Sequence, residues 1–323
     1  SIDAAFSVIT RGPALPAAAR FVANTAQPSA AACFQRTWHT LLRSYLKRTP
    51  AAVHAITRLD QRGGRVHNDH IALRAFVDSD GRSGLGFLDT LFTSFGYAGQ
   101  ESITIPSLPV NARWYEPPAE TDWPKVFVSE LRVAELPRAA ADIVFSHIDG
   151  YYNISENGAL KAALAARDGD ALARLLDQPA WIPSKAEVET VRDADGGDPA
   201  MRAATEYASW TLTHGHRINH LTVLQNVLDL DEAADLQSLN ALLVGEGLEF
   251  NAAGGSDGLT QGSPALHLEQ SSTLADRVPH TFGCGTTEQV PCAFLELIQR
   301  HESFRGFLGQ NAKGIFASTH AAR

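Results

Sequence analysis

Apolar residues gather into several short, β-prone stretches of the chain, and three of these stretches each carry one side chain that can bind a metal. The stretches are VHNDHIALRAF, HRINHLTV and CAFLELIQR, and the side chains are those of His70, His220 and Glu296. Residues two apart in a strand share a face, so each of these side chains points the same way as apolar neighbours. The pattern predicts that all three face an interior rather than bulk water.

Other stretches predict the elements around these strands. Apolar residues at helical spacing predict helices over 30–60 and, apart from the loop DADGGDP, over 134–210. The stretch GRSGLGFLDTLFTSFGYAG predicts a loop followed by a short helix. The segments KVFVSELRV, LEFNAAGG and ALHLEQSS predict further strands separated by turn residues.

The two regions that are predicted to form sheet show a weak internal similarity. One opens with Asp69-His70 and the other with Asn219-His220, and strands containing Glu130 and Glu296, each followed by Leu, close them. The separations differ, so the similarity is not a clean repeat, and chance explains it as well. A true repeat would mean two similar half-barrels that face each other with the site between them.

Length and composition narrow the class of protein. The chain has 323 residues, 44% of them hydrophobic, which is enough for one large domain or two halves. A net charge of −9 leaves no basic stripe for a nucleic-acid partner, and no apolar run approaches the roughly 18 residues of a membrane span. The three cysteines (Cys33, Cys284 and Cys292) lack CxxC spacing and predict a reducing, intracellular compartment.

Two imidazoles and one carboxylate form the ligand set of a non-haem iron(II) site that keeps positions open for substrate and oxygen. Structural zinc instead prefers four protein ligands, usually with thiolates. A carboxylate that faces a core needs a partner, and a metal would supply one to Glu296. Alternatively, Glu296 pairs with an arginine, and His70 and His220 are satisfied core residues. Because all three stand in matching contexts, we favour the metal.

Several other residues could be mistaken for a site. His214 and His216 precede His220 and share its strand parity, but Gly215 between them favours a turn, which leaves His214 as a reserve ligand. Cys284 has no evident basic partner that would make it a nucleophile. The chain contains no GxxxxGK[ST] or HExxH motif, and its one GxSxG match, GGSDG, lies in the Gly-rich stretch AAGGSDGLTQGS, which follows no strand–helix pattern.

Two families share segments with this chain. The stretch FLELIQRHESFRGFLGQNAKGIF resembles the C-terminal signature of 4-hydroxyphenylpyruvate dioxygenases, in which the corresponding glutamate binds iron. A fuller resemblance is to the DUF1338 family of 2-oxoadipate dioxygenase/decarboxylases, also called hydroxyglutarate synthases. It rests on NDHIALRAF, NARWYEPP, PKVFVSELRV, HGHRINHLT, GSPALHLEQSS and FLELIQR, which are spread over roughly residues 60 to 315. Both families belong to the vicinal oxygen chelate superfamily.

The resemblance implies an iron(II)-dependent reaction of 2-oxoadipate with O2 that gives 2-hydroxyglutarate and CO2, and a place in lysine catabolism. It implies metal ligands at His70, His220 and Glu296 and a substrate-binding arginine at Arg74. A salt bridge to an acidic side chain is the alternative for Arg74. The resemblance also matches Gln270 to a family glutamine that contacts substrate or oxygen, although a backbone-bonded core glutamine is nearly as plausible.

The fold that the resemblance implies is α+β, with paired βαβββ modules forming a half-open barrel around the metal. We expect an N-terminal helical segment at 1–60, a first half at 61–135, a helical insertion at 136–210 and a second half at 211–323 that carries two of the three metal ligands. A glyoxalase- or isomerase-like enzyme on the same fold would use Glu130 as a fourth ligand. A non-catalytic binding protein would hold no stoichiometric metal.

We expect a 2-oxo acid and O2 as partners and no nucleic acid or membrane; the sequence leaves the oligomeric state open. Residues 1–35 are rich in Ala, Ser and Arg with few acids, which resembles the tail of a transit peptide, although plain helix-forming composition explains them equally well. We therefore expect a cytoplasmic location, or a plastid if the source is eukaryotic.

Overall fold

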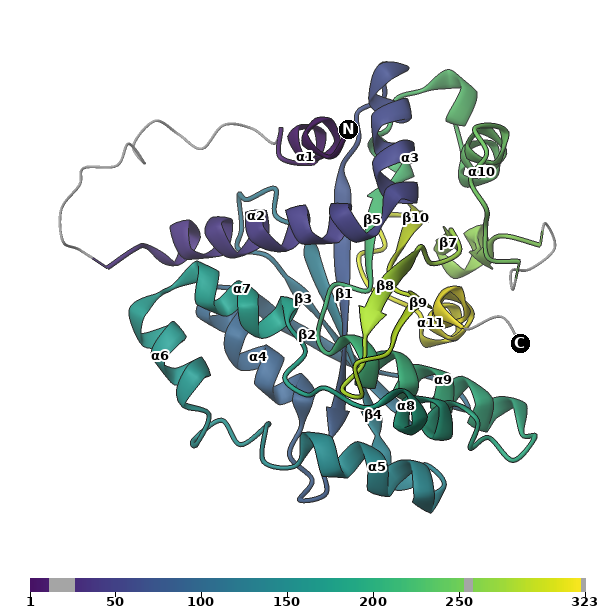
Figure 1. Cartoon of the computed structure of the whole chain (residues 1–323). Coiled ribbons are helices and arrows are strands. Elements are labelled where there is room, and N and C mark those ends of the chain that lie inside the picture. Colours follow the sequence, from purple (N-terminus) through teal and green to yellow (C-terminus); the bar gives the residue numbers. More distant parts are fainter. Residues whose placement is uncertain (12–26, 253–257, 321–323) are drawn as a thin grey trace.

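One curled sheet of eight strands organises the protein, with helices on both of its faces (Figure 1). The computed structural model describes residues 1–11, 27–252 and 258–320. The strand order across the sheet is β2-β3-β4-β1-β5-β10-β7-β6. The order divides at the centre, between β1 and β5, into two groups of four strands that have the same internal arrangement.

Each group belongs to one βαβββ unit. The first unit consists of β1 (Asn68–Val77), α4 (Gly84–Ser94), β2 (Ala98–Thr104), β3 (Val110–Glu116) and β4 (Lys125–Arg132). The second consists of β5 (His220–Leu224), α10 (Leu236–Gly245), β6 (Gln261–Ser263), β7 (Leu268–Ser272) and β10 (Phe294–Arg300). In both units the first strand runs parallel to the last, and β1 and β5 join the units as an antiparallel pair. The predicted α+β fold with paired βαβββ modules is confirmed.

The remaining elements surround this sheet. They are the helices α1 (Ile2–Ile9), α2 (Ala30–Arg48), α3 (Pro50–Gln61), α5 (Arg138–Ile148), α6 (Gly158–Ala166), α7 (Gly169–Asp177), α8 (Lys185–Arg192), α9 (Pro199–His214) and α11 (Gly309–Phe316), and the hairpin β8 (Arg277–Thr281) and β9 (Thr287–Pro291). The helix predicted over 30–60 is divided by Pro50, which stands at the first position of α3, where its missing N–H costs nothing. No helix in the described ranges combines the length and apolarity needed to cross a membrane.

The period-two alternation of the strands decides which helices cover which face. On the outer face, the Ser271 hydroxyl donates to Asn240 of α10 (2.6 Å), and α4 begins against Ala75 of β1. On the inner face, Ser129 of β4 bonds the Tyr207 hydroxyl of α9 (2.9 Å). Helix α11 packs over the same inner face. The inner face, closed by α9 and α11, therefore holds the side chains at even positions of β1, including His70 and Arg74.

Two details of the sequence prediction fail. The predicted strand LEFNAAGG is absent from its described part, where Phe250 makes only an isolated bridge to Thr273; residues 253–255 of that segment lie outside the described residues. The hairpin β8–β9, which is inserted between β7 and β10, was not expected at all. Its strands are largely exposed, so they carry no apolar alternation to reveal them.

Candidate metal centre

Three buried donors converge on the inner face where the two units meet. One ligand atom from each of His70, His220 and Glu296 can be chosen so that all lie within 4.8 Å of one another. His70 Nε2 is 3.4 Å from Glu296 Oε1, and His220 Nε2 is 3.2 Å from Glu296 Oε2. The strands β1, β5 and β10 are neighbours in the sheet, so residues more than 200 positions apart in sequence become adjacent in space. The structure thus brings the three predicted ligands together.

Each histidine is oriented by the residue that precedes it. A β-bulge between Asn68 and His70 displaces Asp69, whose carboxylate accepts a hydrogen bond from His70 Nδ1 (2.8 Å). His220 Nδ1 donates to the Asn219 side-chain oxygen (3.0 Å). Both bonds place the ring proton on Nδ1 and leave the Nε2 lone pair facing the cluster, which is the tautomer that a metal requires. Sequence analysis noted the Asp-His and Asn-His pairs without recognising this role.

The charges of the cluster also suit a cation. Burial lowers the pKa of His70 against the opposing pull of Asp69, and burial, with His70 and Arg74 nearby, holds the pKa of His220 well below its usual range. Both rings are therefore neutral. Burial raises the pKa of Glu296 to about 8, because water is excluded and its hydrogen bonds only partly compensate. The Thr222 hydroxyl lies 3.0 Å from His70 Nε2, and a divalent cation would replace this hydrogen bond, restore the carboxylate and bind both imidazoles, so this donor set fits a metal.

Glu296 pairs with no arginine in the described chain; an amide chain orients it instead. Gln270 Nε2 donates to Glu296 Oε1 (2.8 Å), and Asn311 Nδ2 of α11 donates to Gln270 Oε1 (3.1 Å). Gln270 is buried and lines the same small cavity as the three donors. Because Asn311 donates to the amide oxygen of Gln270, the amide nitrogen of Gln270 faces the Glu296 carboxylate.

Arg74 is the least expected feature of the inner face. Its side chain is fully buried, and none of its three guanidinium nitrogens has a hydrogen-bond partner among the described residues. The guanidinium lies 4.8 Å from the ring centres of Tyr207 and Trp210 and 5.1 Å from that of Phe316. Burial lowers the pKa of Arg74 to about 10, which leaves it charged at neutral pH. The charge of Glu206 acts on Arg74, but Arg74 forms no salt bridge among the described residues, and a buried cation that forms no ion pair calls for a ligand.

Apolar side chains close the cavity around the donors. The cavity has a volume of about 20 Å³, and its walls come mainly from α11 and the segment before it: Phe127, Phe307, Leu308, Ala312, Ile315 and Phe316. Phe307 packs edge-on against the His70 ring, with 4.8 Å between centroids. Phe316 contacts both this cavity and Arg74. All of them except Phe127 lie in the stretch FLELIQRHESFRGFLGQNAKGIF, but periodicity does not single them out, because only the folded chain brings α11 over the sheet.

The strand register shows why Glu130 does not match Glu296. His70 faces Lys125 just as His220 faces Phe294, so the residue equivalent to Glu296 is Phe127. Glu130 lies three residues further on, an odd offset that turns it to the outer face. There Glu130 Oε2 accepts from the Ser83 hydroxyl (2.6 Å) and the Leu85 N–H (3.0 Å) at the start of α4. The structure offers no fourth carboxylate ligand at this position.

The other candidates also take positions outside the cluster. His214 ends α9, where its ring bonds the Pro291 carbonyl (2.9 Å), and His216 bonds the Arg74 carbonyl (2.9 Å). His214 as a reserve ligand is therefore wrong: Gly215, with φ +66°, turns the chain after it. Cys284 is exposed in the β8–β9 turn and contacts Thr286.

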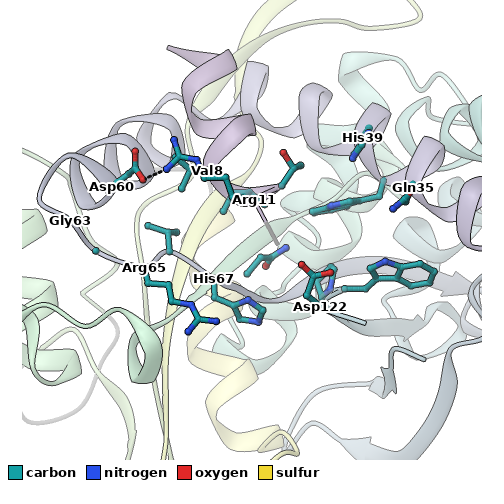
Figure 2. Close-up of a pocket in the computed structure, with 17 residues that line it drawn as sticks. Val8, Arg11, Gln35, His39, Asp60, Gly63, Arg65, His67 and Asp122 are labelled. Carbon is teal, nitrogen blue, oxygen red and sulfur yellow. Dashed lines mark hydrogen bonds and ion pairs between the residues drawn. The ribbon is translucent and has the colours of Figure 1, made fainter. Parts of the chain in front are cut away.

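A larger hollow of about 670 Å³ lies elsewhere, between the N-terminal helices and the start of β1 (Figure 2). An ion pair between Arg11 and Asp60 (2.6 Å) spans part of it, and His67 lines it. Its titratable side chains do not converge on one point, and no metal-competent group in the described residues includes them. Size alone therefore does not identify the reactive centre.

Comparison with known proteins identifies one enzyme family that matches most of the chain. The family model of 2-oxoadipate dioxygenase/decarboxylase matches residues 37–303. The rice (Oryza sativa subsp. japonica) protein named 2-oxoadipate dioxygenase/decarboxylase, chloroplastic/amyloplastic, is 30% identical over 96% of this chain and 85% of its own length. The crystal structure of rice hydroxyglutarate synthase in complex with 2-oxoadipate aligns with a TM-score of 0.73 and 26% identity, covering 93% of this chain and 98% of that one.

A more distant structure agrees on the fold alone. A Ralstonia eutropha JMP134 protein, described as belonging to the glyoxalase superfamily, aligns with a TM-score of 0.68 and 20% identity over 95% of this chain and 98% of its own. The predicted resemblance is thereby confirmed, and so is the assignment to an oxidoreductase family. The chain belongs to the 2-oxoadipate dioxygenase/decarboxylase family.

Proposed function

We propose that this chain converts 2-oxoadipate and O2 into 2-hydroxyglutarate and CO2 at an iron(II) ion. One observation carries the proposal: a fully buried guanidinium with no hydrogen-bond partner among the described residues is close enough for its charge to act on His220, one of three converging metal donors. The atoms and electrons balance without a further reductant, because the 2-oxo acid supplies all four electrons: two as its keto carbon becomes a carboxylate with loss of CO2, and two from the C–H bond that is hydroxylated. One oxygen atom of O2 enters the new carboxylate, and the other becomes the hydroxyl group.

His70, His220 and Glu296 would hold the metal. Iron(II), when bound, supplies the redox chemistry that lets O2 react with a 2-oxo acid. Two imidazoles and one carboxylate occupy one side of such an ion and leave positions for the substrate and for O2. Asp69 and Asn219 keep both imidazoles in the metal-binding tautomer.

Arg74 would bind the distal carboxylate of the substrate. It stands four residues from His70 on the same strand face, which is about 13 Å along the backbone at ~3.3 Å per residue. The planar guanidinium can take a carboxylate bidentately, and that anion would satisfy a charge that no described residue now satisfies. The three aromatic rings around Arg74 hold the guanidinium in place and exclude water from the pair.

Gln270 would orient Glu296 and contact the substrate or O2 through its remaining N–H. The aromatic and aliphatic walls around it keep bulk water from the reacting atoms. The glyoxalase-like alternative required Glu130 as a fourth ligand, and Glu130 bonds the start of α4 on the outer face. The geometry therefore favours the oxygen-dependent reaction.

Anaerobic loading with iron(II), addition of 2-oxoadipate and admission of O2 tests this function. We expect O2 uptake equal to the 2-hydroxyglutarate formed, with both lost in His220→Ala. Bound iron without O2 uptake would contradict the proposed reaction, and failure to bind iron would contradict the proposed ligands.

The cellular setting is a finer part of the proposal. The rice relative carries a chloroplastic/amyloplastic designation in its name, which supports a plastid if the source is a plant. The cytoplasm remains our prediction for other sources. The role in lysine catabolism follows from the proposed substrate and product and stays a prediction with them.

A further inference from the structure

The last residue of β10 connects the metal centre to the segment that covers it. Arg300 Nε and Nη2 donate to the two carboxylate oxygens of Asp69, at 2.9 and 2.8 Å. Asp69 in turn accepts the Nδ1 hydrogen of His70. Asp69 and Arg300 are largely buried, with side-chain exposures of 1% and 9%. This bidentate pair therefore fixes the carboxylate that sets the orientation of His70.

The same guanidinium also holds the covering segment, residues 301–308. Arg300 Nη1 donates to the Gly306 carbonyl (2.7 Å), directly before Phe307. The guanidinium carbon lies 5.1 Å from the centre of the Phe307 ring, and that ring packs against His70. The backbone of Arg300 is itself fixed, because its N–H and C=O both bond the Asn226 side chain at 2.8 Å.

We propose that Arg300 is a positioning residue that couples the orientation of His70 to closure of residues 301–308 over the metal centre. One side of its guanidinium fixes His70 through Asp69, and the other fixes Phe307 through the Gly306 carbonyl. Because both contacts use one planar group, opening the segment loosens the ligand, and binding of the metal favours the closed segment. This inference rests on the proposed metal site.

Anaerobic cobalt(II) titration gives a readout that does not depend on turnover. Removal of a partner that orients a metal-bound histidine typically weakens metal affinity by ~10- to 100-fold. We expect Arg300→Gln to raise the cobalt(II) Kd by that factor and to change the ligand-field absorption spectrum. Arg300→Lys retains the charge but cannot form the parallel pair and reach Gly306 together, so it should not restore the spectrum. Asp69→Asn should shift the spectrum in the same direction.

Arg132 provides a matched control. It ends β4, the corresponding strand of the first unit, and pairs with Glu135 and Asn111 away from the donors. Arg132→Gln should keep the wild-type spectrum and Kd. Circular dichroism and thermal unfolding of each variant distinguish a loss of fold from a loss of positioning. If Arg300→Gln folds poorly, the spectra and Kd values of Arg300→Lys and Asp69→Asn test the inference instead.

The coupling itself is tested by the rate at which excess chelator removes cobalt(II). Phe307→Ala removes the covering contact with His70, so it should accelerate metal loss and, because closure and metal binding favour each other, also raise Kd, though by less than Arg300→Gln does. If Arg300 acts through the same closure, Arg300→Gln/Phe307→Ala should lose metal no more than ~2-fold faster than Arg300→Gln. The inference would be overturned if the double variant loses cobalt(II) faster than the wild type by the product of the two single-variant factors, or if Arg300→Gln keeps the wild-type spectrum. A wild-type protein that binds no cobalt(II) would instead refute the proposed metal site.

Discussion

Replacement of Arg74 by Met separates a substrate-binding role from a structural one. Met is of similar length and fills the same apolar surroundings without a charge. The fall in the pKa of Arg74 from 12.5 to about 10 corresponds to about 3 kcal/mol against the charged side chain in the folded protein. Contacts with three aromatic rings oppose this cost at ~0.5–2 kcal/mol each, or ~1.5–6 kcal/mol in total. The two effects are of similar size, so removing the charge should change the stability of the substrate-free protein by no more than ~3 kcal/mol in either direction.

Activity, in contrast, should fall sharply. Truncating one partner of a buried charge pair costs ~2–5 kcal/mol, or roughly a 30- to 4,000-fold fall in kcat/KM for 2-oxoadipate at 1.4 kcal/mol per factor of ten. The analogue 2-oxohexanoate, in which a methyl group replaces the distal carboxylate, should lose a similar factor with the wild-type enzyme. In Arg74→Met, kcat/KM for 2-oxohexanoate should be close to that for 2-oxoadipate, because the group that binds the distal carboxylate is already gone.

Thermal unfolding and steady-state kinetics on both substrates measure these effects, with Arg132→Met as the control on a partly exposed arginine. An exposed pair contributes only ~0–1 kcal/mol, so the control should change neither quantity much. The reasoning is refuted if Arg74→Met lowers Tm by more than ~5 °C, which marks a structural cation, or if it still prefers 2-oxoadipate over 2-oxohexanoate as strongly as the wild type.

Three further predictions follow from the same geometry. Burial raises the pKa of Glu296 from 4.5 to about 8, so between these pH values the folded protein keeps a proton that the unfolded chain has lost. The metal-free protein should therefore lose stability as the pH rises from about 4.5 to 8, by up to ~1.4 kcal/mol per pH unit. Chemical denaturation across this range should show this slope, and Glu296→Gln should abolish it. Metal binding at pH 7 should release about one proton, since the ion needs the carboxylate; calorimetry in buffers of different ionisation enthalpy measures this, and equal apparent enthalpies would contradict it. Glu130→Gln should cost ~1–2 kcal/mol of stability through the weakened start of α4 yet leave cobalt(II) affinity unchanged, whereas a loss of affinity would revive the four-ligand alternative.

Strand periodicity was sufficient to predict which side chains share the inner face. His70 and Arg74 stand at even spacing on one buried strand, and His220 and Glu296 each lie among apolar neighbours, so their direction follows from the pleat alone. The repeat of two βαβββ units was likewise visible as a faint similarity. Its residue-level alignment was wrong because Glu130 and Glu296 differ by an odd register offset, which only strand pairing reveals.

Contacts made across the folded chain could not be predicted in the same way. Phe307 and Asn311 reach the site because the segment after β10 folds back over the sheet, and although both lie in the family-like stretch 294–316, no periodicity indicates their roles. Asp69 orients His70 because of a β-bulge, whereas regular alternation would point it to the other face. The exposed hairpin β8–β9 lacked an apolar signal. Local patterns thus indicated the ligands, and tertiary closure supplied the residues that orient and cover them.

A single turnover under ¹⁸O₂ tests the central claim most directly. Anaerobic protein loaded with iron(II) and 2-oxoadipate is mixed with ¹⁸O₂, and the product is analysed by mass spectrometry. The proposed reaction predicts 2-hydroxyglutarate that carries two labelled oxygen atoms, one in the new carboxylate and one in the hydroxyl group, with no product from His220→Ala. Unlabelled product, or turnover that persists in the absence of O2, would contradict the proposed oxygen chemistry at His70, His220 and Glu296.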